Sequence, residues 1–467
     1  MVYKEKEEIF SQGAVVEKNN DLEFKDFILF KEKIVDNLVD TIILGEDEEL
    51  KKICFWIAYK AGLNQGVFPS TIYSLYKAKA EENLPLFTVP AINLRTLTYD
   101  LARAVFRAAK KINAGAFIFE IAKSEIGYTF QRPAEYASLV ILAGMKENYK
   151  GSIFIQGDHF QIKAKNYYQD KEKELAQLKD LIKEAIRAGF YNIDIDTSTL
   201  VDLSKDSVEA QQEENFKVCA QVTRFIREIQ PPGVEVTVGG EIGEIGGRNS
   251  TPSELHAFMR GYLKEIGALQ GISKMAIQTG TTHGGVVLPD GSIARVKIDF
   301  DTLRELSKIA KEEYKLAGCV QHGASTLPRE AFHHFPQVGC CEIHLATQFQ
   351  NIVYEYMPLS LKEEIYKWLE ENCAQERKPD WSDDQFIYKT RKKALGPFKK
   401  KIYSLPKDLK DKISHTLEEG FLFLFNQLKI QNTKEIVEKY VPTIPLEKKK
   451  QDFLQEEVRL EELEGAD

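Results

Sequence analysis

The most constraining feature of this sequence is a short apolar segment that occurs eight times and alternates with segments of helical periodicity. In one helical segment, Leu175, Leu178 and Ile182 recur at helical spacing, and Gly189 follows as a C-terminal cap. Strands that alternate with helices form parallel sheets. Eight such units over about 270 residues match an α/β fold of the (β/α)8 type, the TIM barrel, which usually takes ~250 residues. The eight predicted strands are Phe87–Ile92, Ala116–Ile121, Ser152–Gln156, Tyr191–Ile195, Glu235–Val238, Lys274–Gln278, Gly318–Gln321 and Cys341–Leu345.

The predicted barrel accounts for only part of the 467 residues. Before it, apolar residues such as Phe30, Ile34 and Leu38 recur at helical spacing. We therefore predict a barrel with helical extensions at both ends. The predicted divisions are a helical N-terminal extension over residues 1–84, the barrel over 85–358, a C-terminal helical region over 359–446 and a charged tail over 447–467.

The charge and composition of the chain exclude several classes of protein. The net charge is −8, with acidic and basic residues interspersed. Nucleic-acid binders usually show a basic patch, so we expect no nucleic-acid partner. No apolar run reaches the ~20 residues that span a bilayer, so we expect no membrane partner. The six cysteines form no C-x-x-C pair, and the first residues do not resemble a signal peptide, so we predict a cytoplasmic protein.

Polar residues gather at the ends of the predicted strands, where barrels of this type carry their active sites. Four of the eight histidines lie there. Three neutral imidazoles with an open fourth position are typical of a catalytic zinc site. We therefore predict that His159, His283 and His322 bind a zinc ion, although such a set also accepts other divalent metals.

Three carboxylates accompany these histidines in the sequence. Asp158 adjoins a predicted ligand, so we assign it as the catalytic acid/base; the alternative is that it only orients a histidine. Asp196 and Glu241 end neighbouring strands, and we predict them as auxiliary metal ligands. The alternative for this pair is a salt bridge to a basic side chain at the same end of the barrel.

Glycine-rich segments lie beside the same residues. Glycine lets backbone N–H groups approach a ligand closely, and the loops after the seventh and eighth strands often hold phosphate. Ordinary tight turns are the alternative. The predicted substrate- and phosphate-binding residues are Asn93, Gly284, Gly323, Ala324, Ser325, His344 and Thr347.

Several short motifs resemble those of the class II, metal-dependent fructose- and tagatose-bisphosphate aldolases. The segments with the closest likeness are Gly157-Asp158-His159, Gly280-Thr281-Thr282-His283-Gly284 and His322-Gly323-Ala324-Ser325. Asp196-Thr197-Ser198, Glu241-Ile242-Gly243 and Glu342-Ile343-His344 follow the family's order. The resemblance covers about Phe87–Tyr356, the whole predicted barrel.

This resemblance implies a mechanism for the predicted residues. The ketose carbonyl would bind the zinc ion held by the three histidines. Asp158 would remove the proton of the C4 hydroxyl as the C3–C4 bond breaks. Phosphate would lie on the backbone of Gly323 and Ser325, with help from Thr347. Asp196 and Glu241 match positions that the family uses for auxiliary metal binding.

Some positions depart from the family's pattern. His344 stands where the family usually has an asparagine, and Ala324 stands where it has a second glycine. Arg248 and Asn249 stand where the family usually has an acidic residue that handles a substrate proton. We assign Arg248 to a phosphate contact instead.

The sequence thus predicts a zinc-dependent aldehyde-lyase with a phosphorylated sugar as its substrate. The predicted reaction is the reversible cleavage of fructose 1,6-bisphosphate, or tagatose 1,6-bisphosphate, to dihydroxyacetone phosphate and glyceraldehyde 3-phosphate. A metal-dependent ketose epimerase on the same barrel is an alternative, which the altered phosphate loop and His344 favour. A partner subunit of a tagatose-bisphosphate aldolase is a further alternative, and the intact metal ligands argue against it. We also expect a homo-oligomer, because the added helices offer interface material.

Overall fold

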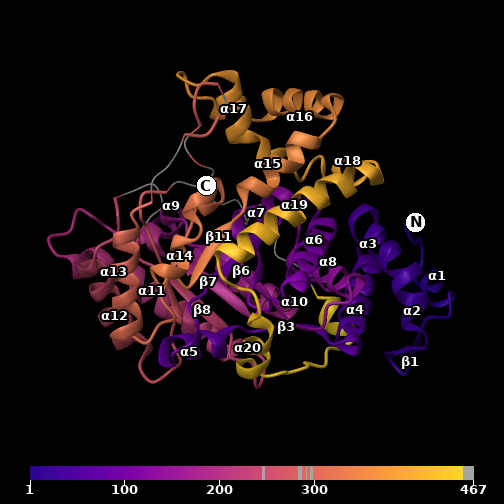
Figure 1. Cartoon of the computed structure of the whole chain (residues 1–467), viewed down its shortest axis with the longest axis horizontal. Helices are drawn as coiled ribbons and strands as arrows, with labels where there is room; N and C mark the ends of the chain where they lie inside the picture. Colours follow the sequence, from indigo (N-terminus) through magenta and orange to yellow (C-terminus); the bar gives the residue numbers. More distant parts are fainter. Residues whose placement is uncertain (244–247, 282–284, 286, 291, 295–297, 456–467) are drawn as a thin grey trace.

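A closed barrel of eight parallel strands forms the centre of the protein in the computed structural model, as predicted (Figure 1). The structure describes residues 1–467 except 244–247, 282–284, 286, 291, 295–297 and 456–467. Each strand pairs with its neighbours in sequence, and the pairing of β11 with β4 completes the ring. The barrel strands are β4 (Val89–Asn93), β5 (Ile118–Ala122), β6 (Gly151–Gln161), β7 (Asn192–Asp196), β8 (Thr237–Glu241), β9 (Lys274–Ile277), β10 (Cys319–Gln321) and β11 (Glu342–Leu345).

A helix follows each strand and covers the outside of the barrel. In α13, Leu303, Leu306 and Ala310 recur at helical spacing and are buried, while the other side of the helix faces solvent. The principal covering helices are α6 (Thr98–Lys111), α8 (Pro133–Lys146), α10 (Lys171–Ala188), α11 (Val208–Ile229), α12 (Pro252–Ile266), α13 (Phe300–Glu312), α14 (His334–Gln337) and α15 (Thr347–Tyr356). Two shorter helices, α7 (Lys123–Thr129) and α9 (Ala164–Gln169), precede α8 and α10.

The inside of the barrel is polar, although nearly all residues of its strands are buried. Every residue of β4, β5, β7 and β8 is buried, as expected for parallel strands covered on both faces. However, Glu120, Gln156, Lys274 and Glu342 are fully buried and hydrogen-bond with one another across the barrel. Barrels of this type more often fill this space with branched apolar side chains. A charged layer therefore lies directly beneath the C-terminal ends of the strands.

The N-terminal region contains strands that the sequence analysis did not predict. β3 pairs in parallel with the first half of β6, with Val67 opposite Gly151 and Ser70 opposite Phe154. Thr71, which follows β3, donates a hydrogen bond to the carbonyl of Glu235 at 2.6 Å. The region is therefore joined to the barrel by a ninth strand of the sheet. Its elements are α1 (Lys6–Phe10), the hairpin β1 (Val15–Lys18) and β2 (Asp21–Phe24), α2 (Phe27–Leu29), α3 (Val35–Leu44), α4 (Glu48–Gln65), β3 (Val67–Ser70) and α5 (Tyr73–Glu81).

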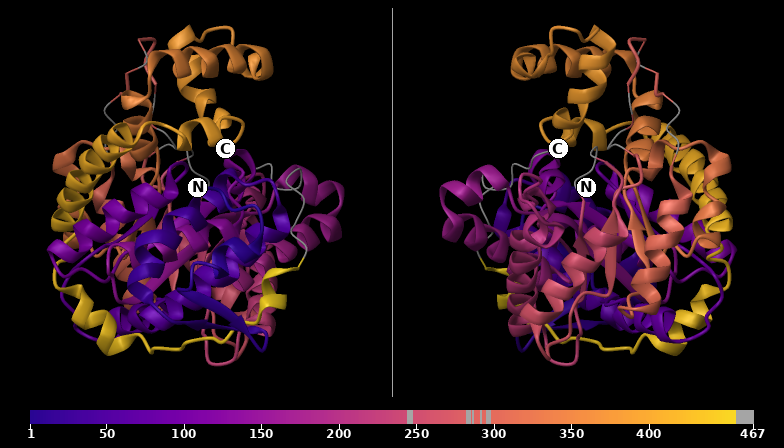
Figure 2. Two further views of the ribbon diagram at one scale, coloured as in Figure 1. Left: turned by 90° about the vertical axis from the view of Figure 1, so that its right-hand side faces the viewer. Right: turned by 90° about the vertical axis from the view of Figure 1, so that its left-hand side faces the viewer.

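The C-terminal region is helical, and part of it projects beyond the barrel. Figures 1 and 2 show α16 (Leu359–Asn372) and α17 (Asp383–Thr390) standing above the C-terminal ends of the strands. The chain returns through α18 (Lys399–Tyr403) and then along α6 as α19 (Lys407–Gln427), where Arg107 pairs with Glu418 at 2.6 Å. None of the helices in the described part of the chain has the length and apolar character of a membrane span.

The last described segment crosses the opposite end of the barrel and reaches the N-terminal region. It begins after α20 (Thr433–Tyr440) and includes α21 (Lys450–Phe453). Tyr59 of α4 donates a hydrogen bond to the carbonyl of Leu446 at 2.8 Å. The ammonium of Lys60 pairs with Glu447 at 2.7 Å. Residues from the two ends of the chain therefore pack together.

Candidate metal and substrate site

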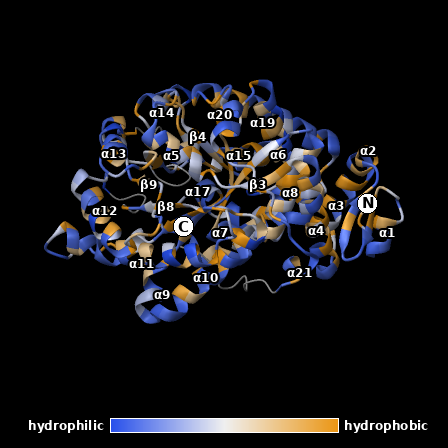
Figure 3. Cartoon of the chain, turned by 90° about the horizontal axis from the view of Figure 1, so that it is seen from below, coloured by the Kyte–Doolittle hydropathy of each residue, from blue (hydrophilic) through white to orange (hydrophobic). Residues whose placement is uncertain are grey.

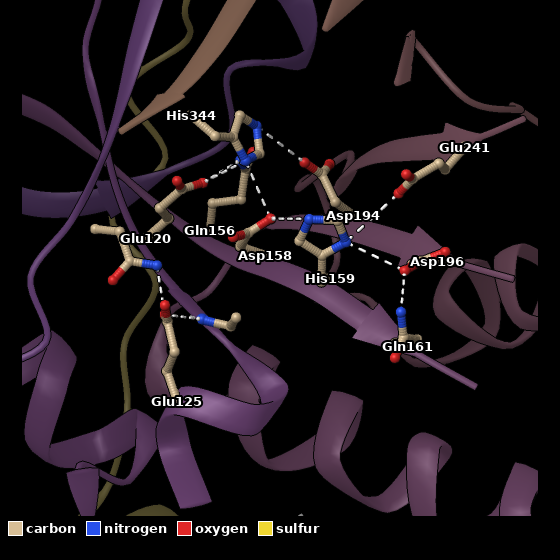
Figure 4. Close-up of polar contacts among 12 residues, drawn as sticks. Glu120, Glu125, Gln156, Asp158, His159, Gln161, Asp194, Asp196, Glu241 and His344 are labelled. Carbon is tan, nitrogen blue, oxygen red and sulfur yellow. Dashed lines mark hydrogen bonds and ion pairs between the residues drawn. The ribbon is translucent and has the colours of Figure 1, made fainter. Parts of the chain in front are cut away.

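A bulge in β6 places Asp158 and His159 at the C-terminal end of the barrel. The pairing of β6 with β7 shifts its register between Gly157 and Phe160. His159 has a φ of 40°, in the left-handed region that side chains other than glycine rarely adopt. Neighbouring side chains of a regular strand point to opposite faces, and a bulge changes that direction. Figure 4 shows Asp158 directed toward His344 and His159 directed toward Asp196.

His159 lies against the two carboxylates that the sequence assigned to auxiliary metal binding. Its Nδ1 atom is 3.1 Å from Oδ2 of Asp196 and 3.5 Å from Oε2 of Glu241. Asp196 also accepts hydrogen bonds from Gln161 at 2.6 Å and from the hydroxyl of Ser198 at 2.7 Å. The basic partner of both carboxylates is thus His159 itself.

The charges of His159, Asp196 and Glu241 favour the binding of a cation among them. Burial alone would lower the pKa of His159, but Asp158 and Glu241 raise it well above its ordinary value. Burial and the charge of Asp196 raise the pKa of Glu241 well above its ordinary value. A proton on the imidazole therefore stabilises the carboxylates, and a divalent cation would replace that charge when it displaces the proton.

His322 lies between His159 and His344. Its ring centroid is 4.2 Å from the centroid of each. The backbone carbonyl of His322 accepts hydrogen bonds from Thr281 at 2.9 Å and from Gln321 at 2.8 Å. Of the three predicted zinc ligands, the structure thus brings His159 and His322 together. His283, and the predicted substrate residue Gly284, lie outside the described residues.

The residues present fit a metal ion. Donor atoms of His159, Glu241 and His322 all lie within 4.8 Å of one another. The same three residues, with Asp196, line an internal cavity of about 10 Å³, close to the ~10–15 Å³ that one water molecule requires. Nitrogen and carboxylate oxygen are ordinary zinc ligands. This combination of donors and space suits one small cation.

His344 joins Asp158 to the charged layer inside the barrel. Its Nδ1 atom is 3.0 Å from Oδ1 of Asp158 and 3.2 Å from Oε2 of Glu120. Its Nε2 atom is 2.7 Å from Oε1 of Glu342. Burial and the nearby charge of Asp158 raise the pKa of Glu120 well above its ordinary value. His344, predicted as a substrate residue, thus has carboxylates on both of its ring nitrogens.

Lys274 is the cation of the layer beneath the histidines. Its ammonium is 2.9 Å from the carboxylate of Asp194 and also donates to Gln156 at 2.7 Å and to Glu342. Burial alone would raise the pKa of Glu342, but Lys274 and His344 hold it at about 2. The sequence analysis missed this layer. The signal was present, because a charged residue inside an otherwise apolar strand of a barrel must find a partner there.

The predicted phosphate loop lies next to an arginine that the sequence analysis did not select. Gly323 has a φ of 65°, which glycine adopts easily, and a 3-10 turn, Ala324–Thr326, follows it. This turn packs against α15, which begins at Thr347. Arg95 donates to the hydroxyl of Thr347 at 3.5 Å. Arg95 follows the first barrel strand by two residues, so the rule that selected the other residues could have found it.

Two other predicted substrate residues contact side chains outside the histidine cluster. Asn93 is buried and donates a hydrogen bond to Glu125, which also pairs with Arg95 at 2.6 Å. The guanidinium of Arg248 pairs with Glu254 at 2.7 Å, and the side chain is 60% exposed. Asn93 therefore helps to position Arg95 through Glu125. Arg248 forms its ion pair with Glu254 in the first turn of α12.

The projecting helices support the loop that follows β9. Gln385 of α17 donates to the carbonyl of Val287 at 2.9 Å. Ser382, which caps α17, donates to the carbonyl of Pro289 at 2.6 Å. The C-terminal helical region is therefore part of the surroundings of the site, a contribution that the sequence analysis did not predict.

Comparison with known proteins identifies the family. The family model described as "Fructose-bisphosphate aldolase class-II" matches residues 73–409, which is most of the chain. Among solved structures, a fructose-bisphosphate aldolase from Campylobacter jejuni is 18% identical, with a TM-score of 0.46, over 77% of this chain and 94% of that one. A protein from Sinorhizobium meliloti 1021, described as a probable tagatose 6 phosphate kinase, is 13% identical, with a TM-score of 0.51, over 76% of this chain and 99% of that one. At such identities the second likeness supports the fold alone. The match to the family model over residues 73–409 shows that this chain belongs to the class II fructose-bisphosphate aldolase family.

Proposed function

We propose that this protein is a metal-dependent aldolase that reversibly cleaves a ketose bisphosphate. The proposed substrate is fructose 1,6-bisphosphate or tagatose 1,6-bisphosphate, and the products are dihydroxyacetone phosphate and glyceraldehyde 3-phosphate. One observation carries the proposal: Asp158, His159 and His322 converge at the C-terminal end of the barrel in a chain of the class II family.

The proposed metal is zinc, although another divalent cation is compatible with the same donors. His159 and His322 would hold it together with His283, and Asp196 and Glu241 would serve as auxiliary ligands. In support, buried carboxylates are the main charged groups around the histidines, among them Asp158, Asp196 and Glu241. When bound, the cation would polarise the substrate carbonyl as a Lewis acid.

Asp158 is the proposed acid/base. In the cleavage direction it accepts the proton of the C4 hydroxyl while the C3–C4 bond breaks. In the direction of synthesis it returns that proton to the new hydroxyl. The contact between Asp158 and His344 supports this role, because it holds the carboxylate at a fixed place at the C-terminal end of the barrel.

The proposed phosphate site combines the loops after β10 and β11. Backbone N–H groups of Gly323, Ala324 and Ser325 would face the phosphate, as would Thr347 at the start of α15. Arg95 adds a positive charge beside Thr347. Arg248, Gly284 and Asn93 stay predicted substrate residues, and the described contacts support Asn93 and Arg248 less than Arg95.

A ketose epimerase is the second candidate, and one observation favours it. Asp158 and Glu120 both lie against Nδ1 of His344, so three groups that can carry a proton are in contact. An epimerase that removes a proton from one face of a carbon and returns it to the other needs such groups. It would convert one ketose phosphate into another without release of triose phosphate.

The test is a coupled assay on purified, zinc-loaded protein. Release of triose phosphate from fructose or tagatose 1,6-bisphosphate is measured with and without EDTA. We expect chelator-sensitive release, a loss of at least ~100-fold in Asp158→Asn with metal retained, and no loss in the control Asp206→Asn, an exposed aspartate. Absence of triose phosphate from both substrates in metal-containing protein would contradict the aldolase, and a ketose product would establish the epimerase.

We also propose that the protein acts in the cytoplasm as a homo-oligomer. All six cysteines are unpaired and buried, as is usual for proteins of a reducing compartment. Sedimentation equilibrium of the purified protein would measure the oligomer, and a monomer at micromolar concentration would contradict it.

A further inference from the structure

A second cavity, of about 240 Å³, lies at the end of the barrel opposite to the histidines. Three of its lining residues, Phe87, Ala317 and Cys340, lie two positions before the first residues of the strands β4, β10 and β11. They therefore mark the N-terminal ends of those strands. Figure 3 views the molecule from this end, where α5, α13 and α14 contribute residues to the lining. Nothing in the proposed aldolase reaction uses this cavity.

Four cationic side chains line the cavity, against one acid. Arg304, Lys308 and Lys311 lie at helical spacing on one face of α13, and Lys79 comes from α5. The acid is Glu312, so the formal charge of the lining is +3, from four positive groups and one negative group. Within the described residues, Arg304 is paired with Asp301, whereas Lys308 and Lys311 form no ion pair. The cavity thus presents an excess of positive charge.

Lys79 is the most buried cation of the cavity, and its ammonium lies 3.7 Å from the centroid of the Phe87 ring. Its side chain is buried, and its ammonium donates one hydrogen bond, to the carbonyl of Phe87 at 2.7 Å. An ammonium has three donors. No carboxylate of the described residues lies within ion-pair distance of it, and burial together with Lys311 lowers its pKa to about 8. A buried charge is costly unless a counter-ion or hydrogen bonds stabilise it, and an anion in the cavity would supply both.

Apart from Ser307 and Gln337, the other side chains that line the cavity are mostly apolar. Leu84, Pro85 and Phe87 line one side, and Val338 lines another. Leu86, which also lines the cavity, is 58% exposed. The volume is somewhat below the ~300–1,000 Å³ of pockets for drug-sized ligands. A ligand that matches the cationic and the apolar parts of the lining is therefore small, with an anionic group attached to an apolar hydrocarbon group.

We propose that this cavity binds a small organic phosphate monoester, at a site separate from the phosphate site of the proposed reaction. A phosphate monoester carries nearly two negative charges and three acceptor oxygens at neutral pH, which match Lys79, Lys308 and Lys311 better than a single carboxylate does. This site is independent of the proposed function and goes beyond it.

Calorimetric titration of the zinc-loaded protein with phenyl phosphate tests the proposal. The variant is Lys308→Glu/Lys311→Glu, at an exposed and a half-exposed position. The matched control is Lys264→Glu/Lys412→Glu, which makes the same charge change at exposed lysines outside the cavity. We expect the variant to bind phenyl phosphate at least ~10-fold more weakly at one site, and the control to bind as the unmodified protein does. Equal binding by the variant and the control would overturn the proposal.

Two further titrations separate this site from the histidine cluster and define the anion. His322→Ala removes a proposed metal ligand, so binding that persists in this variant and is lost on adding Lys308→Glu/Lys311→Glu supports the second site. Binding that disappears in His322→Ala alone overturns it. Benzoate has the same ring and a single negative charge, and we expect it to bind at least ~10-fold more weakly than phenyl phosphate. Equal affinity for the two would overturn the assignment to phosphate monoesters.

Discussion

The Nδ1 atom of His344 lies 3.0 Å from the Oδ1 atom of Asp158, while the opposite ring nitrogen lies 2.7 Å from Glu342. The imidazole therefore connects the proposed catalytic acid/base to the charged layer inside the barrel. Since Glu342 also accepts a hydrogen bond from Lys274, the position of Asp158 depends on residues that never reach the substrate.

Replacement of His344 tests whether it positions Asp158. We expect His344→Ala to lower kcat about 10- to 100-fold, the usual effect of losing a partner that orients a site residue, with little change in KM. His344→Asn keeps a donor for Asp158 and should restore part of the rate. The pH profile of kcat separates this role from a merely structural one, because the acidic limb should move in His344→Ala as Asp158 loses its partner. An unchanged kcat and profile would contradict it.

Replacement of His322 tests the metal site apart from catalysis. His322 lies within reach of both His159 and Glu241, so His322→Ala should reduce bound zinc to well under one ion per chain after dialysis. Elemental analysis measures the zinc content. The control is His256→Ala on α12, where the imidazole contacts Tyr314 instead of the site. Full zinc content in His322→Ala would show that the ion is held elsewhere.

The charged layer makes Lys274 important for stability. In Lys274→Met, Asp194 and Glu342 lose their buried counter-ion, which typically costs about 3–5 kcal/mol. We expect Lys274→Met/Glu342→Gln to recover part of this loss, since it removes one of the uncompensated charges. Urea unfolding measures the free energy of unfolding of the single and the double variant. Lys264→Met, at an exposed position, is the control. Equal loss in the single and double variants would contradict the pairing.

The buried ammonium of Lys79 makes stability depend on pH. Burial and the neighbouring Lys311 lower its pKa to about 8, while the thiols of Cys340 and Cys341 oppose this shift. Between pH 8 and the ordinary value of 10.5, the unfolded chain holds a proton that the folded chain has released, so stability rises with pH in this window. Below pH 8 the cost of the buried charge is fully present.

Lys79→Met should therefore stabilise the protein most at neutral pH, and its advantage should disappear near pH 10.5. Urea unfolding in a phosphate-free buffer at pH 7, 9 and 10 measures the difference. Lys308→Met, at an exposed position, is the control. An advantage that does not change with pH would show that Lys79 is neutral in the folded protein throughout.

The eight barrel strands could be predicted because each is a short, almost wholly buried apolar run beside a helix of clear periodicity. The same reasoning missed β3. Val67–Ser70 follows α4 directly and has only four residues, and its partner, the first half of β6, is 84 positions further along the chain, as the pairing of Val67 with Gly151 shows. Local periodicity carries no information on such a pairing.

The candidate site, like the fold, could be predicted only in part from the sequence. Strand ends predicted which residues could meet, and Asp158, His159, Asp196, Glu241 and His322 do meet. Their contacts depend on the bulge in β6, which has no local signature, and on the polar interior, whose charged residues stand in the sequence without any sign of which residue each one meets. Lys274 and Glu120 stand inside apolar runs, where a charged residue reads as an interruption of a strand rather than as a partner for another strand.

The contact between Lys60 and Glu447 joins residues that are 387 positions apart. During synthesis, the N-terminal helices leave the ribosome long before the segment that covers them. Tyr59 and Lys60 therefore lack these partners while the intervening 387 residues are made, which at ~5–20 residues per second takes tens of seconds. Until Leu446 and Glu447 have been made, this face of the N-terminal region stays uncovered and accessible to chaperones.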